Sequence, residues 1–347
     1  MASLKGTILI TGANGGLGSA LVRSISSSPE LRSYHGICTV RNADIAPSLG
    51  SVLSHAPSSH TFDVLSLDLT DLGSVREAAR IISARVSKKE IPPIRALILN
   101  AGFQDFGHQT WTSDGYDTTF KANYLGHWLL TLLLLRSMDK GRGRIIVVGS
   151  RSHDPDDPRN ASTRAFVEER YKTFIEDETR FTAIAKGTWS SAAEDPSWRS
   201  GFRRYGASKL FLIMMMHELQ RRLNRDPTLH DICVLGVDPG TMSTSLQRKA
   251  PWFIRVFVLQ ILYPLLAWLR PPGPARSTEQ SASDILQAAF DSNDVLGEFP
   301  KDVYLDGTNV LETSVESRDV RKCRLVWEKS AEITGIKEDK MVPRHYY

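Results

Sequence analysis

The 347-residue sequence contains only three cysteines, and this scarcity excludes disulfide-rich extracellular proteins. Cys38, Cys233 and Cys323 are odd in number and widely spaced, and two of them lie in or beside short apolar runs. A disulfide framework needs paired cysteines, and a structural zinc site needs closely spaced ligands. We therefore expect reduced core thiols in an intracellular protein, and no bound metal.

An excess of charge of one sign is also lacking. The chain has 43 Lys and Arg residues against 39 Asp and Glu residues, which gives a formal net charge of +4. No dense block of Lys and Arg stands out from this mild balance. Since nucleic-acid binding usually needs a basic patch or stripe, we expect no nucleic acid among the partners.

No apolar stretch is long and uninterrupted enough for a membrane-spanning helix, which needs ~20 residues. The most apolar segment, 251–269, contains Arg255, Gln260 and Pro264. Three interpretations of 251–269 remain open: a lid over a hydrophobic substrate, a helix resting on a membrane surface, or a buried packing helix. Residues 1–5 lead directly into the first apolar run without a signal peptide. We predict a cytoplasmic protein, with peripheral membrane contact through 251–269 as one option.

Short apolar runs alternate with helical patterns along the chain. The runs, each as long as a buried strand, cover 7–10, 37–40, 64–67, 96–99, 145–148 and 232–237. Such alternation predicts an α/β protein with a doubly wound parallel sheet, and 41% hydrophobic residues are ample for its core. No internal repeat or low-complexity linker divides the chain, so we predict one domain over 1–347.

A glycine-rich turn follows the first apolar run. The sequence Thr11-Gly-Ala-Asn-Gly-Gly-Leu-Gly18 leads into a helical pattern that continues through Ile25. Glycines permit a tight turn and close approach of the backbone to a pyrophosphate, which the N-terminus of the next helix would attract. A turn without any ligand is the alternative, but the order strand, glycines, helix favours a dinucleotide site.

Tyr205 and Lys209 lie one helical turn apart in a stretch, 205–223, that is typical of a helix. This spacing places a phenol and an ammonium on the same helix face. A cation beside a phenol lowers a pKa that is otherwise ~10, so that the tyrosine can exchange a proton near neutral pH. Taken alone, the pair also fits a solvated helix face.

Together these segments resemble the short-chain dehydrogenase/reductase family over almost the whole chain. The resemblance implies a Rossmann-type sheet, a nicotinamide cofactor and a catalytic tetrad of Asn123, Ser150, Tyr205 and Lys209. In such a tetrad Tyr205 gives its proton to the carbonyl oxygen, or takes the alcohol proton in reverse, and Lys209 holds the ribose. Ser150 hydrogen-bonds the substrate oxygen. Asn123 orders its helix and a water that leads from Lys209 to solvent.

The same resemblance implies a set of cofactor-binding residues. The first strand turn supplies the glycine motif, Asp68 and Leu69 lie at the adenine, and Asn100-Ala-Gly102 stabilises the central sheet. The motif Asp238-Pro-Gly240 with Thr244 resembles the segment that closes over the nicotinamide. The full implied set is Gly12, Asn14, Gly16, Leu17, Gly18, Asp68, Leu69, Asn100, Ala101, Gly102, Asn123, Tyr205, Lys209, Pro239, Gly240 and Thr244.

Several stretches resemble the family branch of retinol dehydrogenases and protochlorophyllide reductases. They are Asp114-Gly-Tyr-Asp117, Asn123-Tyr-Leu-Gly-His127, Ser277-Thr-Glu-Gln-Ser-Ala282 and Leu325-Val-Trp-Glu-Lys-Ser330. A family branch predicts a substrate poorly. Retinoid-like alcohols, steroids, lipid aldehydes and secondary metabolites all remain open.

The residue after the second apolar run bears on the choice of cofactor. The run 37–40 ends in Arg41 and Asn42 rather than in an acid. An acid there would bind the 2′-hydroxyl of NAD, whereas a guanidinium suits the 2′-phosphate of NADP. We favour NADP(H) with Arg41 as its ligand. NAD(H) is the minority alternative, in which Asp44 folds back, and Arg41 is then a plain surface residue.

An insertion separates two members of the tetrad. Ser150 and Tyr205 lie farther apart than in the short family pattern, so 151–204 carries additional structure. We predict one or two helices within 164–184, a loop over 193–201, and a substrate loop or lid over 241–275. Candidate pocket walls in the insertion are Trp189, Trp198 and Phe202. The alternative is that the insertion lies on the surface and does not contact the substrate.

These features predict an NADP(H)-dependent oxidoreductase that interconverts a carbonyl and an alcohol, with reduction favoured. Its substrate would be a hydrophobic small molecule such as a secondary metabolite, a lipid or a retinoid-like compound. One alternative is a catalytically silent NAD(P)-binding regulator, and the other is an isomerase or lyase without net redox turnover. We also expect a homodimer or homotetramer built through the apolar helices over 117–137 and 205–223. The alternatives are that these faces pack within one chain, or that the apolar segment 251–269 blocks the contact.

Overall fold

The computed structural model of this chain describes residues 4–58, 60–242, 276–294 and 296–336. The described strands form one eight-stranded sheet in the order β3-β2-β1-β4-β5-β6-β7-β8. Neighbouring strands are parallel except at β8, which pairs with β7 in the antiparallel sense. The strands are β1 (Gly6–Thr11), β2 (Tyr34–Val40), β3 (Phe62–Ser66), β4 (Ile94–Leu99), β5 (Arg144–Val148), β6 (Cys233–Asp238), β7 (Val303–Asp306) and β8 (Asn309–Val310).

The sheet is doubly wound, as the alternating apolar runs predict. From β1 the chain passes through β2 to β3 at one edge, and then crosses to β4 on the other side of β1. At such a reversal the loops that follow neighbouring strands diverge, which leaves a crevice at the carboxyl ends of β1 and β4. The order of the strands thus defines where a ligand site belongs.

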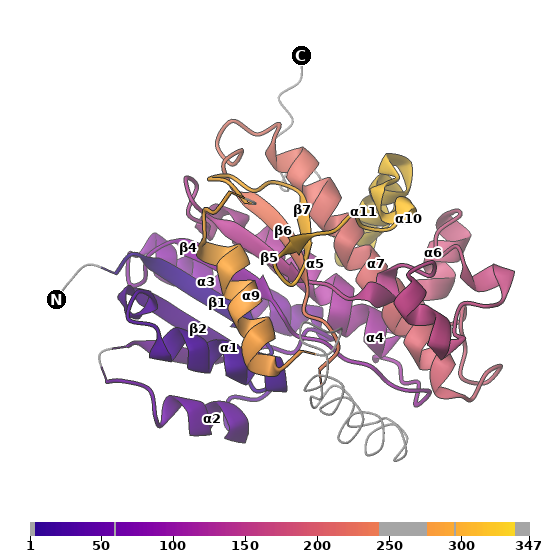
Figure 1. Cartoon of the computed structure of the whole chain (residues 1–347), viewed down its shortest axis with the longest axis horizontal. Helices are drawn as coiled ribbons and strands as arrows, with labels where there is room; N and C mark the ends of the chain where they lie inside the picture. The colour runs from indigo at the N-terminus through magenta and orange to yellow at the C-terminus, as the bar shows by residue number, and fades with distance from the viewer. Residues whose placement is uncertain (1–3, 59, 243–275, 295, 337–347) are drawn as a thin grey trace.

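Helices cover both faces of this sheet (Figure 1). On one face α1 packs against α2 and α9, and on the other α3 packs against α5 while α7 packs against α11. Each face has its own cluster of buried apolar side chains. These helices are α1 (Gly16–Ser27), α2 (Pro47–Leu53), α3 (Leu72–Ser87), α5 (Gly126–Leu134), α7 (Trp198–Leu223), α9 (Thr278–Phe290) and α11 (Val320–Thr334).

Shorter helical segments connect these elements. Several of them belong to the insertion between β5 and α7, which contains one α-helix, α6, within the predicted range. They are η1 (Leu31–Ser33), α4 (Thr118–Phe120), η2 (Lys121–Leu125), η3 (Leu135–Ser137), η4 (Arg151–His153), η5 (Pro158–Thr163), η6 (Glu169–Tyr171), α6 (Glu178–Ala185) and α10 (Val315–Arg318).

The helix that carries Tyr205 begins earlier than predicted. It starts at Trp198, inside the predicted loop 193–201, and the Ser197 side chain caps it by accepting the Arg199 N–H. Gly201 weakens the helical signal of the sequence. A Cβ at Gly201 would overlap a carboxylate oxygen of Asp105, so the close packing of this helix explains the glycine. The loop prediction is therefore wrong over 198–201.

The helical region over 118–137 contains a π-helical turn, η2, at Lys121–Leu125. Asp117 begins the region by accepting the backbone N–H groups of Thr119 and Phe120. Turns of the π type are rare and occur often at functional sites. This one contains Asn123, the first member of the predicted tetrad.

The two helices predicted to form an interface are covered by the chain itself. Helix α11 packs along α7, and the Trp327 ring meets the Trp128 ring of α5 edge to face at 5.3 Å. Nearby, the Tyr124 hydroxyl and the Ser330 hydroxyl are 2.6 Å apart. The apolar faces of 117–137 and 205–223 therefore belong to the core of one chain, which corrects the expectation that they bind a partner.

We predict that the protein is a monomer in solution. The apolar faces that would form the expected contact are already buried by α11, and a second copy would have to displace that helix. Multi-angle light scattering at working concentration should give one particle of 38.7 kDa. A stable particle of twice that mass would contradict this prediction and would require an interface elsewhere on the surface.

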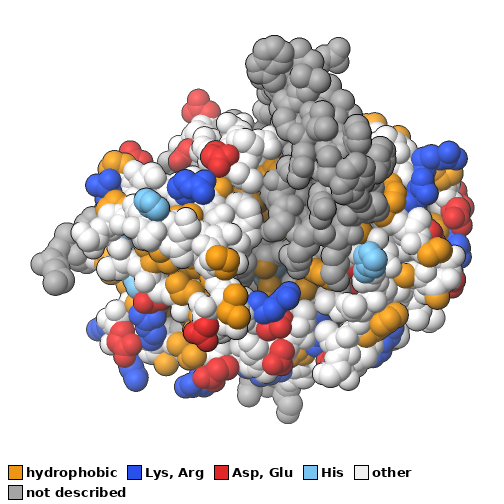
Figure 2. Space-filling model, turned by 90° about the horizontal axis from the view of Figure 1, so that it is seen from below, with side chains coloured by type: hydrophobic (Ala, Val, Ile, Leu, Met, Phe, Trp, Pro, Cys, Tyr) orange, Lys and Arg blue, Asp and Glu red, His pale blue; other side chains and the backbone are white. Residues whose placement is uncertain are grey.

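The face of the molecule seen in Figure 2 shows no large field of one charge sign outside the grey residues. On the face seen in Figure 2, basic and acidic side chains are interspersed. Among the described helices, none has the length and apolar character needed to cross a membrane. The described residues also contain no group of three or more His, Cys, Asp or Glu side chains arranged to hold a metal ion.

Candidate active site

A cavity of about 660 Å³ lies at the carboxyl ends of the central strands. Since β2 and β5 lie on opposite sides of β1 and β4, the cavity extends from Arg41 after β2 to Gly149 after β5. Fourteen of the predicted residues line it: Gly12, Asn14, Gly16, Leu17, Gly18, Arg41, Asp68, Leu69, Asn100, Ala101, Gly102, Tyr205, Lys209 and Pro239. The structure thus brings most of the predicted set together in one elongated site.

Some predicted residues lie outside this lining. Asn123 and Ser150 are next to lining residues but do not line the cavity themselves, and the same holds for Gly240. Thr244 and the whole of 251–269 lie outside the described residues. Sequence reasoning missed several lining residues that flank the motifs, namely Thr39, Asn42, Ile45, Ser48, Thr70, Phe103, Ala122 and Met242. Most of them carry no signal except proximity to a strand end, whereas Ala122 is marked only by its neighbour Asn123, and Ser48, in α2, has no such signal.

The glycine turn after β1 leaves room for a ligand against the backbone. Gly12 has a positive φ of 68°, and a side chain there would also collide with the backbone of Ala101. A Cβ at Gly18 would overlap the Gly12 carbonyl oxygen. The first turn of α1, which begins at Gly16, contains no acidic residue. These properties fit a pyrophosphate at the helix N-terminus.

Hydrogen bonds hold the glycine turn to the loop after β4. The Asn100 side-chain amide donates to the Thr11 carbonyl at 2.7 Å, and the Thr11 hydroxyl accepts the N–H groups of Asn100 and Ala101 at 2.9 and 3.0 Å. His127 Nε2 lies 2.9 Å from the same hydroxyl, and its Nδ1 lies 3.0 Å from the Asn123 carbonyl. Burial lowers the pKa of His127 to about 4, so the ring is neutral. This histidine was not predicted as a site residue.

The end of the cavity near Arg41 and Asp68 carries both charge signs. Asp68 accepts the backbone N–H and the hydroxyl of Thr70 at 2.9 and 2.7 Å, which fixes its carboxylate. Arg41 Nε lies 3.9 Å from the other carboxylate oxygen of Asp68. The Arg41 side chain is 66% exposed and free to turn toward a ligand. Asp44 does not line the cavity.

The Asn123 side chain joins two segments of the chain by hydrogen bonds. Its side-chain oxygen accepts the Phe103 N–H at 2.7 Å, and its amide donates to the Phe103 carbonyl and to the Ser208 hydroxyl, both at 2.9 Å. Phe103 belongs to the loop after β4 and Ser208 to α7. The buried Asn123 amide therefore fixes the distance between the loop after β4 and α7, the helix that carries Tyr205 and Lys209.

Ser150, Tyr205 and Lys209 meet at the end of β5. The Ser150 hydroxyl lies near the phenol of Tyr205 and acts to lower its pKa. The Lys209 ammonium donates to the Val148 carbonyl at 2.7 Å and lies 5.6 Å from the centre of the Tyr205 ring. Tyr205 and Lys209 therefore line the cavity together with Gly149, and Ser150 follows Gly149 without lining it, so the three residues lie close together as the tetrad pattern predicts.

The electrostatics of this group differ from the expectation. Burial raises the pKa of Tyr205 well above its ordinary value, and the nearby Ser150 hydroxyl only opposes that effect. Burial also lowers the pKa of Lys209 to about 8, against the opposing charge of Asp238. Because the ammonium is directed to the Val148 carbonyl, it does not depress the pKa of the phenol in this structure. The expectation that Lys209 lowers the pKa of Tyr205 is therefore wrong for this structure.

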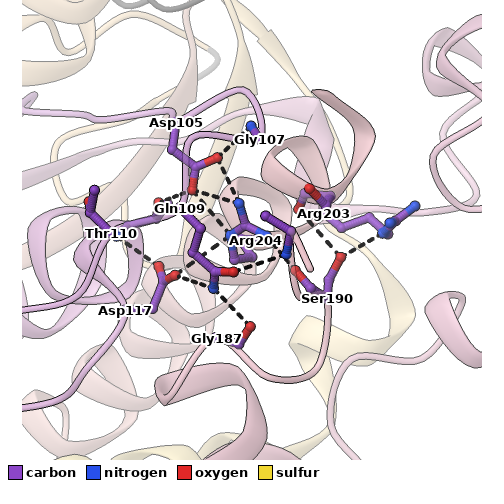
Figure 3. Close-up of polar contacts among 12 residues, drawn as sticks. Asp105, Gly107, Gln109, Thr110, Asp117, Gly187, Ser190, Arg203 and Arg204 are labelled. Carbon is purple, nitrogen blue, oxygen red and sulfur yellow. Dashed lines mark hydrogen bonds and ion pairs between the residues drawn. The ribbon is translucent and has the colours of Figure 1, made fainter. Parts of the chain in front are cut away.

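A buried ionic cluster, the Arg204 cluster, fastens the insertion to the catalytic helix (Figure 3). Arg204, next to Tyr205 in the chain, donates to Asp105 at 2.8 Å and lies 3.6 Å from Asp117. It also donates to the Ser190 carbonyl of the insertion. Gln109 links Asp117 to the Gly187 carbonyl, at 3.0 and 2.9 Å. The cluster thus joins the loop after β4, the start of α4, the insertion and α7.

The aromatic residues predicted as pocket walls have another role. Trp189 is only 8% exposed and packs edge to face on Tyr171 at 5.4 Å, inside the core. Trp198 and Phe202 contact each other at 5.9 Å. None of these three rings lines the cavity that the described residues form, so their assignment as walls of a substrate pocket stays a prediction.

Comparison with known proteins agrees with the geometry. Residues 6–160 match the model of a family described as short chain dehydrogenase. The short-chain dehydrogenase iccH of Talaromyces variabilis is 43% identical over an alignment of 346 positions that covers 94% of this chain and 94% of its own. A chloroplastic protochlorophyllide reductase of Daucus carota is 26% identical over 96% of this chain and 79% of its own. Retinol dehydrogenase 13 of Homo sapiens is 28% identical over 95% and 85%. The predicted similarity to this branch is confirmed.

A solved structure supports the fold. The carbonyl reductase from chicken fatty liver, described as NADPH bound, superposes with a TM-score of 0.56. The two sequences are only 16% identical, and the alignment covers 90% of this chain and all of the other. At this level of identity the similarity concerns the arrangement of strands and helices.

Proposed function

Because this chain belongs to the short-chain dehydrogenase family, we propose that it is an NADP(H)-dependent oxidoreductase that reduces a ketone or aldehyde on a hydrophobic small molecule. The observation that carries the proposal is the convergence of Ser150, Tyr205 and Lys209 at one end of a cavity that begins at the glycine turn. A silent regulator would not need a buried phenol near a serine and beside a lysine.

The cavity suits a dinucleotide along its whole length. The backbone of the glycine turn and the N-terminus of α1 would hold the pyrophosphate, and Asp68 and Leu69 would flank the adenine. Lys209 would hold the ribose next to the nicotinamide. When bound, the cofactor supplies the hydride, and the protein supplies position and electrostatics.

The proton is supplied by Tyr205. Burial raises the pKa of the phenol, so Tyr205 is protonated over the neutral range and can donate to the oxygen of the reduced carbonyl. Ser150 would bind that oxygen and stabilise the charge that develops on it. Lys209, with a pKa of about 8, is near the pH at which it can pass a proton toward the phenolate. This arrangement favours reduction at neutral pH.

The end of β2 favours NADP(H) over NAD(H). Arg41, Asn42 and Ser48 line the cavity there, whereas Asp44 does not. A guanidinium and a hydroxyl together suit a 2′-phosphate, and the cavity presents no acid after β2 that would repel it. The NADPH-bound carbonyl reductase with the same fold supports this choice as an analogy.

The catalytic end of the cavity favours an apolar substrate. Phe103, Ala122, Val148 and Met242 line it next to Tyr205. The relatives named after retinol and protochlorophyllide act on large apolar molecules, which supports a substrate of that class. The substrate loop over 241–275, of which all but 241–242 lies outside the described residues, is proposed to complete the pocket.

The proposal is tested by NADPH consumption with a panel of apolar ketones and aldehydes. Wild type should oxidise NADPH with at least one member, and Arg41→Ala should raise the KM for NADPH about 10- to 100-fold. Hydrogen bonds to a charged group are worth ~1.5–3 kcal/mol, which corresponds to that range. The KM for NADH should change little, since NADH has no 2′-phosphate.

The matched control is Arg23→Ala, which removes an exposed arginine of α1 that pairs with Glu279. It should leave both KM values unchanged. Equal losses for NADPH and NADH in Arg41→Ala would refute the role of Arg41. If the wild type binds NADPH tightly but turns over no member of the panel, the regulator becomes the better explanation.

A further inference from the structure

His127, near the start of α5, is a buried histidine that contacts two segments of the site. Its Nδ1 lies 3.0 Å from the carbonyl oxygen of Asn123, and its Nε2 lies 2.9 Å from the hydroxyl of Thr11. His127 does not line the cavity itself, whereas Gly12, which follows Thr11, does. The ring therefore lies behind the cavity, between the glycine turn and a member of the predicted tetrad.

The hydrogen-bond partners determine which ring nitrogen of His127 carries the hydrogen. A carbonyl oxygen can only accept, so Nδ1 must donate to the Asn123 carbonyl. The hydroxyl of Thr11 has two acceptor positions, and the N–H groups of Asn100 and Ala101 occupy both, at 2.9 and 3.0 Å. The hydroxyl is left with its own hydrogen, which Nε2 must accept. The ring is therefore neutral, with its hydrogen on Nδ1.

A second acceptor competes for the Thr11 hydrogen only at longer range. The carbonyl oxygen of Ile98 lies 3.4 Å from the Thr11 hydroxyl, compared with 2.9 Å for His127 Nε2. Hydrogen bonds weaken with distance, so the ring nitrogen is the favoured acceptor. If the ring were removed, the hydroxyl hydrogen would turn toward Ile98, and the lone pairs of the oxygen would turn away from the two N–H groups that they accept.

The loop after β4 is held by both partners of His127. Residues 100–103 form this loop, and all four line the cavity. The start of the loop is bound by the Thr11 hydroxyl, and the Asn123 side chain binds its end through the N–H and carbonyl of Phe103, at 2.7 and 2.9 Å. Because His127 contacts both of these residues, it closes a ring of hydrogen bonds around the middle of the cavity.

We propose that His127 is a positioning residue, which orients the Thr11 hydroxyl and thereby fixes the loop 100–103 against the glycine turn in the geometry that the cofactor requires. This inference rests on the proposed function only in that the cavity binds a nicotinamide dinucleotide. Loss of the ring should weaken cofactor binding more than it lowers kcat, because neither of its two partners gives or takes the proton in the reaction.

The first test is the position of the hydrogen on the ring. Histidine is labelled with ¹⁵N, and the His127 signals are identified by their loss in His127→Gln. A spectrum that correlates the ring nitrogens with the carbon-bound ring hydrogens should give Nδ1 the shift of a protonated nitrogen and Nε2 that of an unprotonated one. The opposite tautomer, or a charged ring at neutral pH, would overturn the proposal, because either would leave the Thr11 hydrogen without its acceptor.

Three substitutions separate the two contacts of the ring. The glutamine of His127→Gln can still accept the Thr11 hydrogen, the asparagine of His127→Asn can still donate to the Asn123 carbonyl, and the phenylalanine of His127→Phe can do neither. Fluorescence titration should give His127→Phe a Kd for NADPH about 10-fold above that of wild type, the effect of one lost hydrogen bond. His127→Gln should restore most of the affinity, and His127→Asn should not. Equal Kd values for the last two variants would contradict the role of the Thr11 contact.

A double-mutant cycle shows whether the effect passes through Thr11. Thr11→Val removes the hydroxyl and should also raise the Kd for NADPH. Residues that act as one unit have non-additive effects, so His127→Phe should add little to the Kd of Thr11→Val. Fully additive effects would show that His127 does not act through this hydroxyl.

The matched control is His217→Phe. It removes a buried histidine of α7 that also has two partners, Asp302 at 2.6 Å and Thr313 at 2.9 Å, and that does not line the cavity. Its Kd for NADPH and its kcat should equal those of wild type, and a loss as large as that of His127→Phe would refute a specific role of His127. If His127→Phe does not fold, the glutamine and asparagine variants decide the question. A wild type that binds neither NADPH nor NADH would contradict the proposed function, and the tautomer would then decide whether His127 orients Thr11.

Discussion

Replacement of Tyr205 with phenylalanine is expected to lower kcat by about 10²–10⁴-fold, the range that a well-placed acid or base contributes. The phenol is buried and lies near Ser150, and no other described tyrosine lines the cavity. The phenylalanine ring preserves the packing of α7, so the Kd for NADPH should change little. Steady-state NADPH consumption and fluorescence titration of NADPH measure the two quantities separately.

Tyr116→Phe is the matched control for this change. Its ring lies under the Lys186 ammonium at 3.7 Å, and the residue does not line the cavity. It should retain wild-type kcat. A Tyr205→Phe variant that kept more than about a tenth of the wild-type kcat would be incompatible with Tyr205 as the proton donor, because the expected loss is far larger.

Arg204→Met is expected to destabilise the fold by ~3–5 kcal/mol, the usual cost of removing one partner from a buried ion pair. The methionine would leave the carboxylates of Asp105 and Asp117 buried without their guanidinium, and both are almost inaccessible to water. Burial already raises the pKa of Asp117 while Arg204 lowers it, so loss of Arg204 should raise it further. Urea unfolding followed by circular dichroism measures the change in free energy.

Two companion variants make this measurement specific. Arg199→Met, on the same helix, removes an arginine whose one hydrogen bond among the described residues is to the Thr163 carbonyl and which stacks on Trp198, and should cost less than ~1 kcal/mol. The double change Arg204→Met with Asp105→Asn should recover part of the lost free energy of unfolding, because it removes one of the two carboxylate charges that Arg204→Met leaves buried without a partner. Equal unfolding midpoints for Arg204→Met and Arg199→Met would show that the Arg204 cluster does not stabilise the fold.

The parts of the site that the sequence predicts are those encoded by neighbouring residues. The glycine turn before Gly18, the Asn100 bridge to Thr11 and the convergence of Ser150 with Tyr205 all follow from short motifs at strand ends. The geometry of these features depends on the local backbone conformation and on the order of the strands. Both can be predicted from the periodicity and composition of the sequence. The same reasoning gives the doubly wound sheet.

The remaining features depend on contacts between distant residues. Arg204 and Asp105 are 99 positions apart, and nothing in either local sequence indicates that they pair. The same is true of Arg159 and Asp238, which meet only because the insertion folds over the ends of β6 and β7. The start of α7 was misjudged because Gly201 serves tertiary packing. The direction of the Lys209 ammonium depends on burial, which the one-turn spacing from Tyr205 does not encode.

Helix α11 covers α5 and α7, and this packing affects the order in which the chain can fold during synthesis. A nascent chain that has not yet reached 320–334 already contains Trp128 and the apolar face of α7, but lacks the helix that shields them. Exposed apolar surface of this kind promotes aggregation during synthesis. We therefore expect the central layer to close only after residues 320–334 have been synthesised, so that an incomplete chain is more prone to aggregate than the full one.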